Sequence, residues 1–386
     1  MRDNRIGSFD TLRGMAALAV CLLHCTPVFG LQKLLPHAYL VVDFFFCLSG
    51  YILLERYKHL ISAGGNGAGI SFRQFSVIRL ARLYPLYAVA LVLGAGYTIL
   101  RLATTDRLSG HLGLVEGSFA TALFVLPYFD ATKILHSESA AFPYVTQSWS
   151  LFWELIASGL FYYWARYGKV KTVIISSIIG FFAIIILASP GKDIDGGWQA
   201  FNFWMGGARA LFSFSLGILV ANTQMTQRYK KSVTGGKLLS FFGYLALAVS
   251  ALYIMVDIES SVAMEMAIVS IAFPVMIAAF STDNTVLLSN RFGKWLGEIS
   301  YSVYLLHGTF AIITLTIISK LHFIHPGILT GVICVSCILI TSTFVRKWIE
   351  LPAQNWLKSK MARRATTDAR KPVKTAGIGL ADVGEP

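Results

Sequence analysis

The chain has 386 residues, of which 55% are hydrophobic and 14% are charged, and its mean hydropathy is +0.62. Soluble domains carry about 25% charged residues, so this composition excludes an ordinary soluble protein and a disordered one. The net charge is +13, and the five cysteines do not have the spacing of a secreted disulfide framework. The remaining class is a polytopic membrane protein.

Apolar runs long enough to cross a bilayer, about 20 residues each, recur along the chain. Because lipid forbids unpaired backbone and these runs exceed the length of strands, we predict an all-α bundle of about ten transmembrane helices. A shorter run, 119–126, is expected to form an interfacial or re-entrant piece within the 102–148 connection. The expected spans are 14–31, 38–55, 83–101, 149–166, 171–188, 203–221, 237–256, 262–280, 298–319 and 327–346.

The basic residues predict the orientation of this bundle. With the N-terminus in the cytoplasm, 26 of the 33 Lys and Arg residues fall on the cytoplasmic side. The positive-inside rule therefore places both termini in the cytoplasm. The surplus charge then reflects topology and attraction to anionic lipid, and does not indicate nucleic-acid binding. We expect residues 1–358 to form the membrane domain and 359–386 to be a disordered basic cytoplasmic tail.

Ionisable residues inside predicted spans are costly, so each of them is a functional hypothesis. For Arg209 and Glu265 the alternative is pairing with other polar groups inside the bundle. For His307 the alternative is a packed, hydrogen-bonded imidazole. The complete set is His24, Asp43, Glu154, Arg209, Glu265 and His307.

Arg13 and His24 have a spacing that aligns them on one helix. Eleven residues at about 100° each return to the same face within about 20°, and the two positions lie about 16 Å apart along the axis. Arg13 would hold an anionic group at the cytoplasmic rim, while an extended group reaches His24 near the middle of the membrane. Imidazole is the usual general base near neutral pH. The alternative is that Arg13 snorkels and His24 only packs.

The segment 72–85 is basic and amphipathic. Its Arg73, Arg79 and Arg82 suit a fork-like phosphate site, and the alternative is a helix that lies among lipid headgroups. Pro85 is expected in the first turn of the following helix. Trp149 and its neighbour Trp153 suit either an interfacial aromatic belt or a stacking platform for a sugar.

These residues, taken in order, resemble the motifs of the membrane-bound acyltransferase family 3. The resemblance covers about residues 9–356, and it is the ordered set that makes it specific. The matching motifs are Phe9-Asp10-Thr-Leu-Arg13-Gly14 followed by His24, Val42-Asp43-Phe-Phe-Phe-Cys-Leu-Ser49-Gly50-Tyr51, Arg79-x-x-Arg82-x-x-Pro85, Trp149-Ser150-Leu-x-x-Glu154, Arg209 with Phe214-x-x-Gly217, Leu296-Gly-x-x-Ser300-Tyr301-x-x-Tyr304-Leu-x-His307, and Glu350-Leu-Pro352.

The resemblance implies transfer of an acyl group, most often acetyl, from cytoplasmic acyl-CoA to a hydroxyl of an extracytoplasmic or lipid-linked carbohydrate. It also implies a bacterial inner membrane protein with acyl-CoA (acetyl-CoA) as co-substrate and no bound cofactor or metal. The implied catalytic residues are His24, Glu154 and Asp43, the donor-binding residues are Arg13, Arg79, Arg82, Asp10 and Ser49, and the acceptor-binding residues are Trp149, Ser150, Tyr301 and His307.

The sequence departs from the family pattern in two places. Many members have a second Glu after the position of Glu154, where this chain has Leu155. Some members append an SGNH-type hydrolase domain, and with no Gly-Asp-Ser block after the last span we expect the membrane part alone.

Two other functions remain open at this stage. One is a component of a glycan exporter, although no repeated halves are visible. The other is a non-catalytic part of a polysaccharide-assembly complex. Polysaccharide-assembly proteins or a second copy of the chain are the further partners expected, in addition to acyl-CoA, the acceptor and the bilayer.

Overall fold

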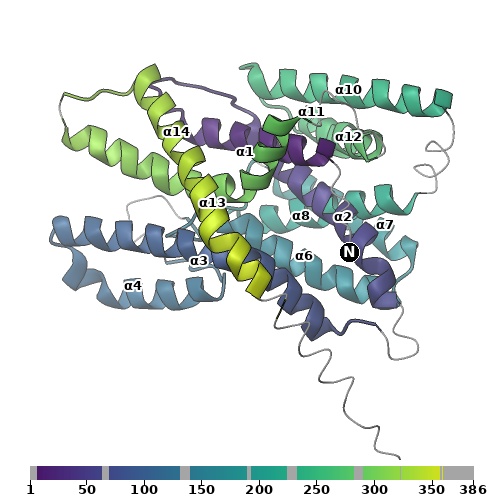
Figure 1. Cartoon of the computed structure of the whole chain (residues 1–386), viewed down its shortest axis with the longest axis horizontal. Helices are drawn as coiled ribbons and strands as arrows, with labels where there is room; N and C mark the ends of the chain where they lie inside the picture. The colour runs from purple at the N-terminus through teal and green to yellow at the C-terminus, as the bar shows by residue number, and fades with distance from the viewer. Residues whose placement is uncertain are drawn as a thin grey trace, which may run out of the picture.

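The computed structural model describes residues 7–62, 69–130, 140–188, 193–223, 233–281, 290–321, 323–356 and 359. These residues form helices joined by loops, and the one β-bridge among them, between Ala140 and Gln199, is isolated (Figure 1). The prediction of an all-α membrane protein is confirmed. The predicted tail lies outside the described residues except for Ser359.

Each predicted span has a helix in the structure, with boundaries that differ from the predicted ones by up to 11 residues. In chain order the helices are α1 (Gly7–Cys25), η1 (Ala38–Leu40), α2 (Val41–Ser62), α3 (Phe72–Thr104), α4 (Leu108–Leu123), α6 (Ser148–Tyr167), α7 (Val170–Leu187), α8 (Phe203–Asn222), α10 (Val233–Met255), α11 (Val262–Ala267), η3 (Ile268–Ala272), α12 (Phe273–Phe280), α13 (Arg291–Lys320), α14 (Ile328–Val345) and η4 (Arg346–Glu350).

Eight helical stretches in the described part of the chain are long and apolar enough to cross a membrane. They include every predicted span except the first and the fourth. Those two form α1 and α6, which are 19 and 20 residues long. Ionisable residues in both helices, including Arg13 and Glu154, lower their hydropathy. Of the predicted short piece at 119–126, residues 119–123 form the end of the longer helix α4, which packs against α3, and residues 124–126 follow that helix.

Two boundaries differ from the prediction for identifiable reasons. Helix α1 begins at Gly7 and takes in Asp10 and Arg13, whose side chains form an i,i+3 ion pair of 2.6 Å. Helix α3 begins at Phe72, where Ser71 and Gln74 form a capping box. The basic segment 72–85 and the predicted span 83–101 therefore form one 33-residue helix. The prediction that Pro85 lies in the first turn of a helix is wrong, because this proline lies inside α3.

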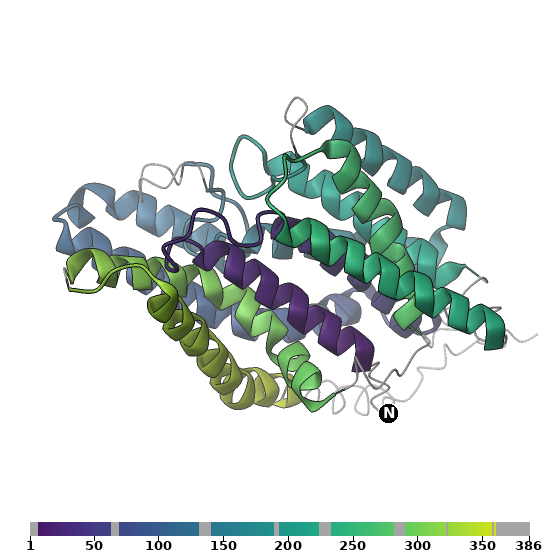
Figure 2. The same cartoon turned by 90° about the horizontal axis from the view of Figure 1, so that it is seen from above.

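Two closely packed helix pairs build the centre of the molecule. Helix α1 packs chiefly on α13, which lies alongside it in Figure 2, and α2 packs chiefly on α8. Glycines permit the close approach: a Cβ on Gly14 would lie 2.7 Å from the backbone nitrogen of Gly297, and a Cβ on Gly217 would overlap the carbonyl oxygen of Cys47. Small residues are the usual means of bringing membrane helices together.

Helix α14 runs across α13 and α3 in Figure 1 and continues into η4, a single π-helical turn that also contacts α3. A second π-helical turn, η3, joins α11 to α12 within one apolar stretch. π-Turns are rare and occur frequently at functional sites. The carboxylate of Glu350 closes η4 and is buried.

Candidate functional site

His24 lies in the last turn of α1, beside His307 in the middle of α13, with the two ring centroids 4.8 Å apart. The Nδ1 atom of His24 lies 2.9 Å from the carbonyl oxygen of Val20. Because a carbonyl only accepts, the ring proton sits on Nδ1 and the Nε2 lone pair is left available. No described residue forms a hydrogen bond to Nε2, and the residue is exposed. His24 therefore has the tautomer and the available lone pair that a general base needs.

His307 is fully buried and both of its nitrogens are engaged. Its Nδ1 lies 3.1 Å from the carbonyl oxygen of Val303, and its Nε2 lies 3.2 Å from Nε2 of Gln147. The first contact places the ring proton on Nδ1, so Nε2 accepts from the Gln147 amide. His307 is thus fixed in orientation and supports the ring of His24.

The hydroxyls of Ser150 and Tyr304 extend the group of polar side chains around the two histidines. Ser150 and Tyr304 lie 2.8 Å apart between their oxygens, and the Ser150 hydroxyl also donates to the carbonyl of Gln147 at 3.0 Å. The Tyr304 ring contacts His307, with the centroids 5.9 Å apart. Helices α6 and α13 therefore present a connected set of polar side chains beside His24.

A basic cluster gathers near the first half of α1. Electrostatic interactions couple Arg82 to Arg13, Arg56 and Arg79 from helices α1, α2 and α3. Arg79 is buried and paired, whereas Arg82 is exposed and has no hydrogen bond or ion pair within the described residues. Guanidinium groups gathered in this way suit an anion with more than one charge.

Glu154 belongs to this cluster and not to the histidines. It accepts a 2.6 Å bond from Nη2 of Arg79 and a 2.9 Å bond from the hydroxyl of Ser49. Asp10 forms the ion pair with Arg13 described above, and Glu350 is electrostatically coupled to Arg346, Arg82 and Arg13. Asp10 and Glu154 thus hold two arginines of the cluster, Arg13 and Arg79, in place.

Asp43 lies in a separate buried network. Its Oδ2 accepts bonds from Nε and Nη2 of Arg209, at 3.1 and 2.7 Å, and its Oδ1 accepts from Ser213 at 3.0 Å. The Trp149 ring covers this ion pair, with the Arg209 guanidinium carbon 5.4 Å from the ring centroid. Arg209 also donates to the Tyr39 carbonyl of η1 at 2.9 Å, so these contacts connect η1, α2, α6 and α8. Both charged side chains are fully buried.

The structure thus separates the predicted site residues into groups. His24, His307 and Ser150 come together, and Arg13, Arg79, Arg82, Asp10, Ser49 and Glu154 surround the basic cluster. Trp149 is buried in the core with Asp43 and Arg209, and the Tyr301 hydroxyl donates to the carbonyl of Leu83 at 2.9 Å. Asp43, Glu154, Trp149 and Tyr301 have described partners other than His24, so their catalytic and acceptor roles stay predictions.

Sequence reasoning missed several residues of the site. Gln147 directly precedes α6 and Tyr304 precedes His307 by one helical turn, so a search for polar residues one turn from each histidine would have found Tyr304. Asp195, which is electrostatically coupled to His24, lies in the loop between α7 and α8, where no periodicity singles it out. Among the described residues, no group of three or more His, Cys, Asp or Glu side chains is arranged to hold a metal ion.

The described helices thus form an all-α membrane bundle with a cluster of arginines near one end of α1 and an available imidazole at the other. A model of the acyltransferase domain of family 3 matches residues 6–346. The chain belongs to this family, and it is a multi-pass membrane acyltransferase.

Two relatives show the breadth of the similarity. The chain is 34% identical over 190 residues to "Protein 2 in picA locus" of Rhizobium radiobacter, a match that covers 47% of this chain and 93% of that protein. It is 26% identical over 397 residues to the "Putative peptidoglycan O-acetyltransferase YrhL" of Bacillus subtilis, covering 97% of this chain and 58% of that protein. No solved structure matches the chain.

Proposed function

We propose that the protein transfers an acyl group, with acetyl as the leading choice, from cytoplasmic acyl-CoA to a hydroxyl of an extracytoplasmic or lipid-linked carbohydrate. The bacterial inner membrane is the proposed location. The Bacillus subtilis relative, named a putative peptidoglycan O-acetyltransferase, supports both the acetyl group and the carbohydrate acceptor.

The observation that carries the proposal is the layout of α1. Arg13 and His24 lie on one continuous helix, so they share a face and are separated by about 16 Å along its axis. The basic cluster surrounds the Arg13 end, and the available Nε2 of His24 lies at the other end. The phosphates of a coenzyme A thioester fit the arginines, and the pantetheine arm extends along the helix and carries the thioester to the imidazole.

The chemistry follows from this placement. His24 Nε2 takes the proton of the acceptor hydroxyl while the hydroxyl oxygen bonds to the thioester carbonyl carbon. The carbon–sulfur bond then breaks, and the imidazolium returns the proton to the leaving thiolate. The bond from Nδ1 to the Val20 carbonyl keeps the ring in the tautomer that this step needs, and contact with His307 fixes its plane.

Two variants of the purified protein in proteoliposomes test the two ends of this arrangement separately. His24→Ala should reduce transfer from radiolabelled acetyl-CoA to envelope carbohydrate by about 10²–10⁴-fold, because a general base is removed, and should leave direct binding of coenzyme A unchanged. Arg82→Ala should weaken coenzyme A binding by about tenfold, because one charge-assisted phosphate contact is lost.

Each variant has a matched control in this chain. His111 in α4 has the same Nδ1 contact to a carbonyl one turn earlier, at 2.8 Å from Arg107, and Arg101 is the exposed arginine at the far end of α3. His111→Ala and Arg101→Ala should behave like wild type. Unchanged transfer in His24→Ala would contradict the role of the imidazole, and unchanged coenzyme A binding in Arg82→Ala would contradict the donor site.

A further inference from the structure

A cavity of about 480 Å³ opens at the end of α1 opposite the basic cluster. Its described lining comes chiefly from three connections: the one between α1 and η1, residues 193–195 before α8, and residues 257–260 before α11. Its volume falls within the range of small-molecule sites. None of the residues predicted from the sequence to bind the acceptor lines it.

The cavity has an acidic lining. Its described charged residues are four carboxylates, Asp193, Asp195, Asp257 and Glu259, and one ammonium, Lys33, which pairs with Asp257 at 2.6 Å. Carboxylates accept hydrogen bonds from hydroxyl and ammonium groups and repel anions. This lining therefore favours a polyhydroxylated or cationic ligand.

His37 gives independent evidence for a ligand with donor groups. It lines the cavity and is 2% exposed, and its Nε2 lies 3.2 Å from the carbonyl oxygen of Ile258. Burial lowers the pKa of His37, so the ring is neutral and Nδ1 carries a lone pair. Nδ1 has no hydrogen-bond partner among the described residues and lies 4.0 Å from Oε1 of the buried Glu265. A donor group on a ligand in the cavity would satisfy this buried acceptor.

The cavity adjoins the proposed reaction centre. Leu23, the residue before His24, lines it, and Asp195 is electrostatically coupled to both His24 and Arg209. Nη1 of Arg209 lies 3.9 Å from Asp195, which ties this wall to the buried core network. A ligand in the cavity therefore lies at the end of α1 that carries His24, away from the basic cluster.

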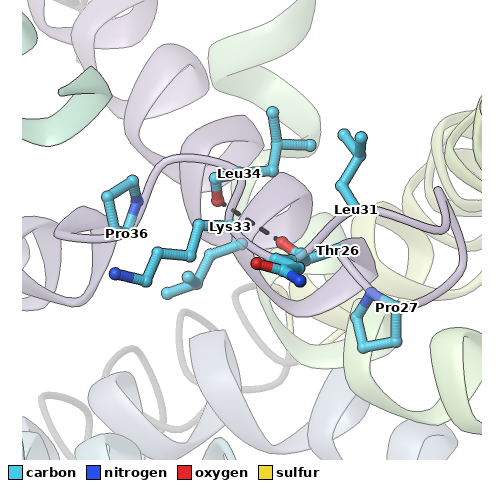
Figure 3. Close-up of a pocket in the computed structure, with 8 residues that line it drawn as sticks. Thr26, Pro27, Leu31, Lys33, Leu34 and Pro36 are labelled. Atoms are coloured by element: carbon cyan, nitrogen blue, oxygen red, sulfur yellow. Dashed lines mark hydrogen bonds between the residues drawn. The ribbon is translucent and has the colours of Figure 1, made fainter. Parts of the chain in front are cut away.

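A neighbouring cavity of about 410 Å³ shares Leu23, Lys33 and Pro36 with the acidic cavity but is mainly apolar (Figure 3). Thr26 donates to the carbonyl of Leu34 at 3.4 Å, and Pro27, Leu31 and Pro36 supply apolar surface. A sugar ring matches the polar lining of the acidic cavity and not this apolar one.

We propose that the acidic cavity binds the acceptor sugar and that its carboxylates select neutral or amino sugars over anionic ones. The identification of the ligand as the acceptor rests on the proposed function. The specificity follows from charge: an amino sugar gains an ion pair, a neutral sugar gains hydrogen bonds, and a uronic acid brings a further negative charge to a wall that already carries several.

Equilibrium binding of three radiolabelled probes to the purified full-length protein tests this selection. The methyl glycosides of glucose, glucosamine and glucuronic acid share a ring and differ in charge. Wild type should bind the glucosaminide best and the glucuronide worst. The double variant Asp193→Asn/Glu259→Gln should weaken glucosaminide binding by about tenfold, because two charges are removed with little change of shape. It should also reduce the difference in affinity between the glucoside and the glucuronide.

Asp106→Asn is the matched control. Asp106 is an acidic residue outside the cavity whose φ of 59° asparagine tolerates, and this variant should bind all three probes like wild type. Absence of binding by wild type, equal binding of the three probes, or identical binding by the double variant and wild type would each overturn the proposal. The binding measurement needs no turnover. If the probes bind in the expected order but the protein does not transfer acetyl groups, the result would count against the proposed function and not against the cavity.

Discussion

At the scale of single residues, Asp43 and Arg209 show how a charged residue inside a membrane span serves the fold. Both side chains are fully buried, and Arg209 also donates to the carbonyls of Gly196 and Tyr39, at 3.0 and 2.9 Å. Every charged atom in this network thus has a partner, as burial requires. The open alternative for Arg209, pairing inside the bundle, is the arrangement that the structure contains. Glu265 is likewise paired, since it accepts from Tyr39, Tyr253 and the backbone of Ile194.

Asp43→Asn should therefore lower the stability of the folded protein by about 3–5 kcal/mol, because the buried Arg209 charge loses its close counter-charge and keeps only the longer contact with Asp195, at 3.9 Å. The midpoint of thermal unfolding in detergent measures this loss, and the transfer rate per folded molecule should change much less. Asp257→Asn breaks the exposed pair with Lys33 and should cost only about 0–1 kcal/mol. Equal losses in the two variants would show that the buried pair is not structural.

At the scale of elements, the contact between α2 and α8 depends on the absence of a side chain at Gly217. A Cβ at this position would overlap the Cys47 carbonyl and lie 2.8 Å from the backbone nitrogen of Tyr51. Both obstacles are backbone atoms, so no rotamer change relieves them. The two helices carry Asp43 and Arg209, so their spacing also sets the geometry of the buried ion pair.

Gly217→Ala should lower the unfolding midpoint and the yield of folded protein, because the helices have to separate to admit the methyl group. Gly159→Ala in α6, where nothing lies within 4 Å of the added Cβ, is the matched control. It should be neutral or slightly stabilising, because alanine favours the helix. A Gly217→Ala protein as stable as the control would contradict the close approach of α2 and α8.

The sequence predicted the positions of the helices better than the pairing of side chains between them. Apolar runs located the helices, because each span has to satisfy its own backbone and hydropathy records that need directly. The alignment of Arg13 with His24 followed from helical geometry alone. The partner of Asp43 lies 166 residues away in Arg209, and such a pairing depends on which helices pack together. The cavity residues Asp193 and Glu259 lie in loops, where no period marks a functional position.

At the scale of the whole molecule, the two proposed sites lie at opposite ends of α1. The basic cluster joins α1, α2, α3 and η4, whereas the acidic cavity is built from loops around the other end of α1. A helix of 19 residues is about 28 Å long, close to the thickness of the hydrocarbon core. The arrangement suits donor and acceptor substrates that approach from opposite faces of a membrane.

Accessibility of single cysteines in whole cells checks the predicted orientation. A cysteine at Asp106, after α3, should react with a membrane-impermeant maleimide in intact cells, because the positive-inside rule places this loop outside. A cysteine at Lys169, between α6 and α7, should react only after permeabilisation. The reverse pattern would invert the molecule and place the basic cluster on the wrong side for a cytoplasmic donor.

The π-turn η4 changes which way the side chains after it face around the axis of the last helix. Upstream of it, Ile340 and Phe344 of α14 are exposed apolar residues suited to lipid. A π-turn holds one residue more than an α-turn, so the chain after it is rotated by about 100° relative to an uninterrupted helix. Glu350 stands at the end of this turn, buried and coupled to Arg82 and Arg13. Because of this additional residue, α14 can expose apolar side chains to lipid while Glu350, directly after it, is buried inside the enzyme.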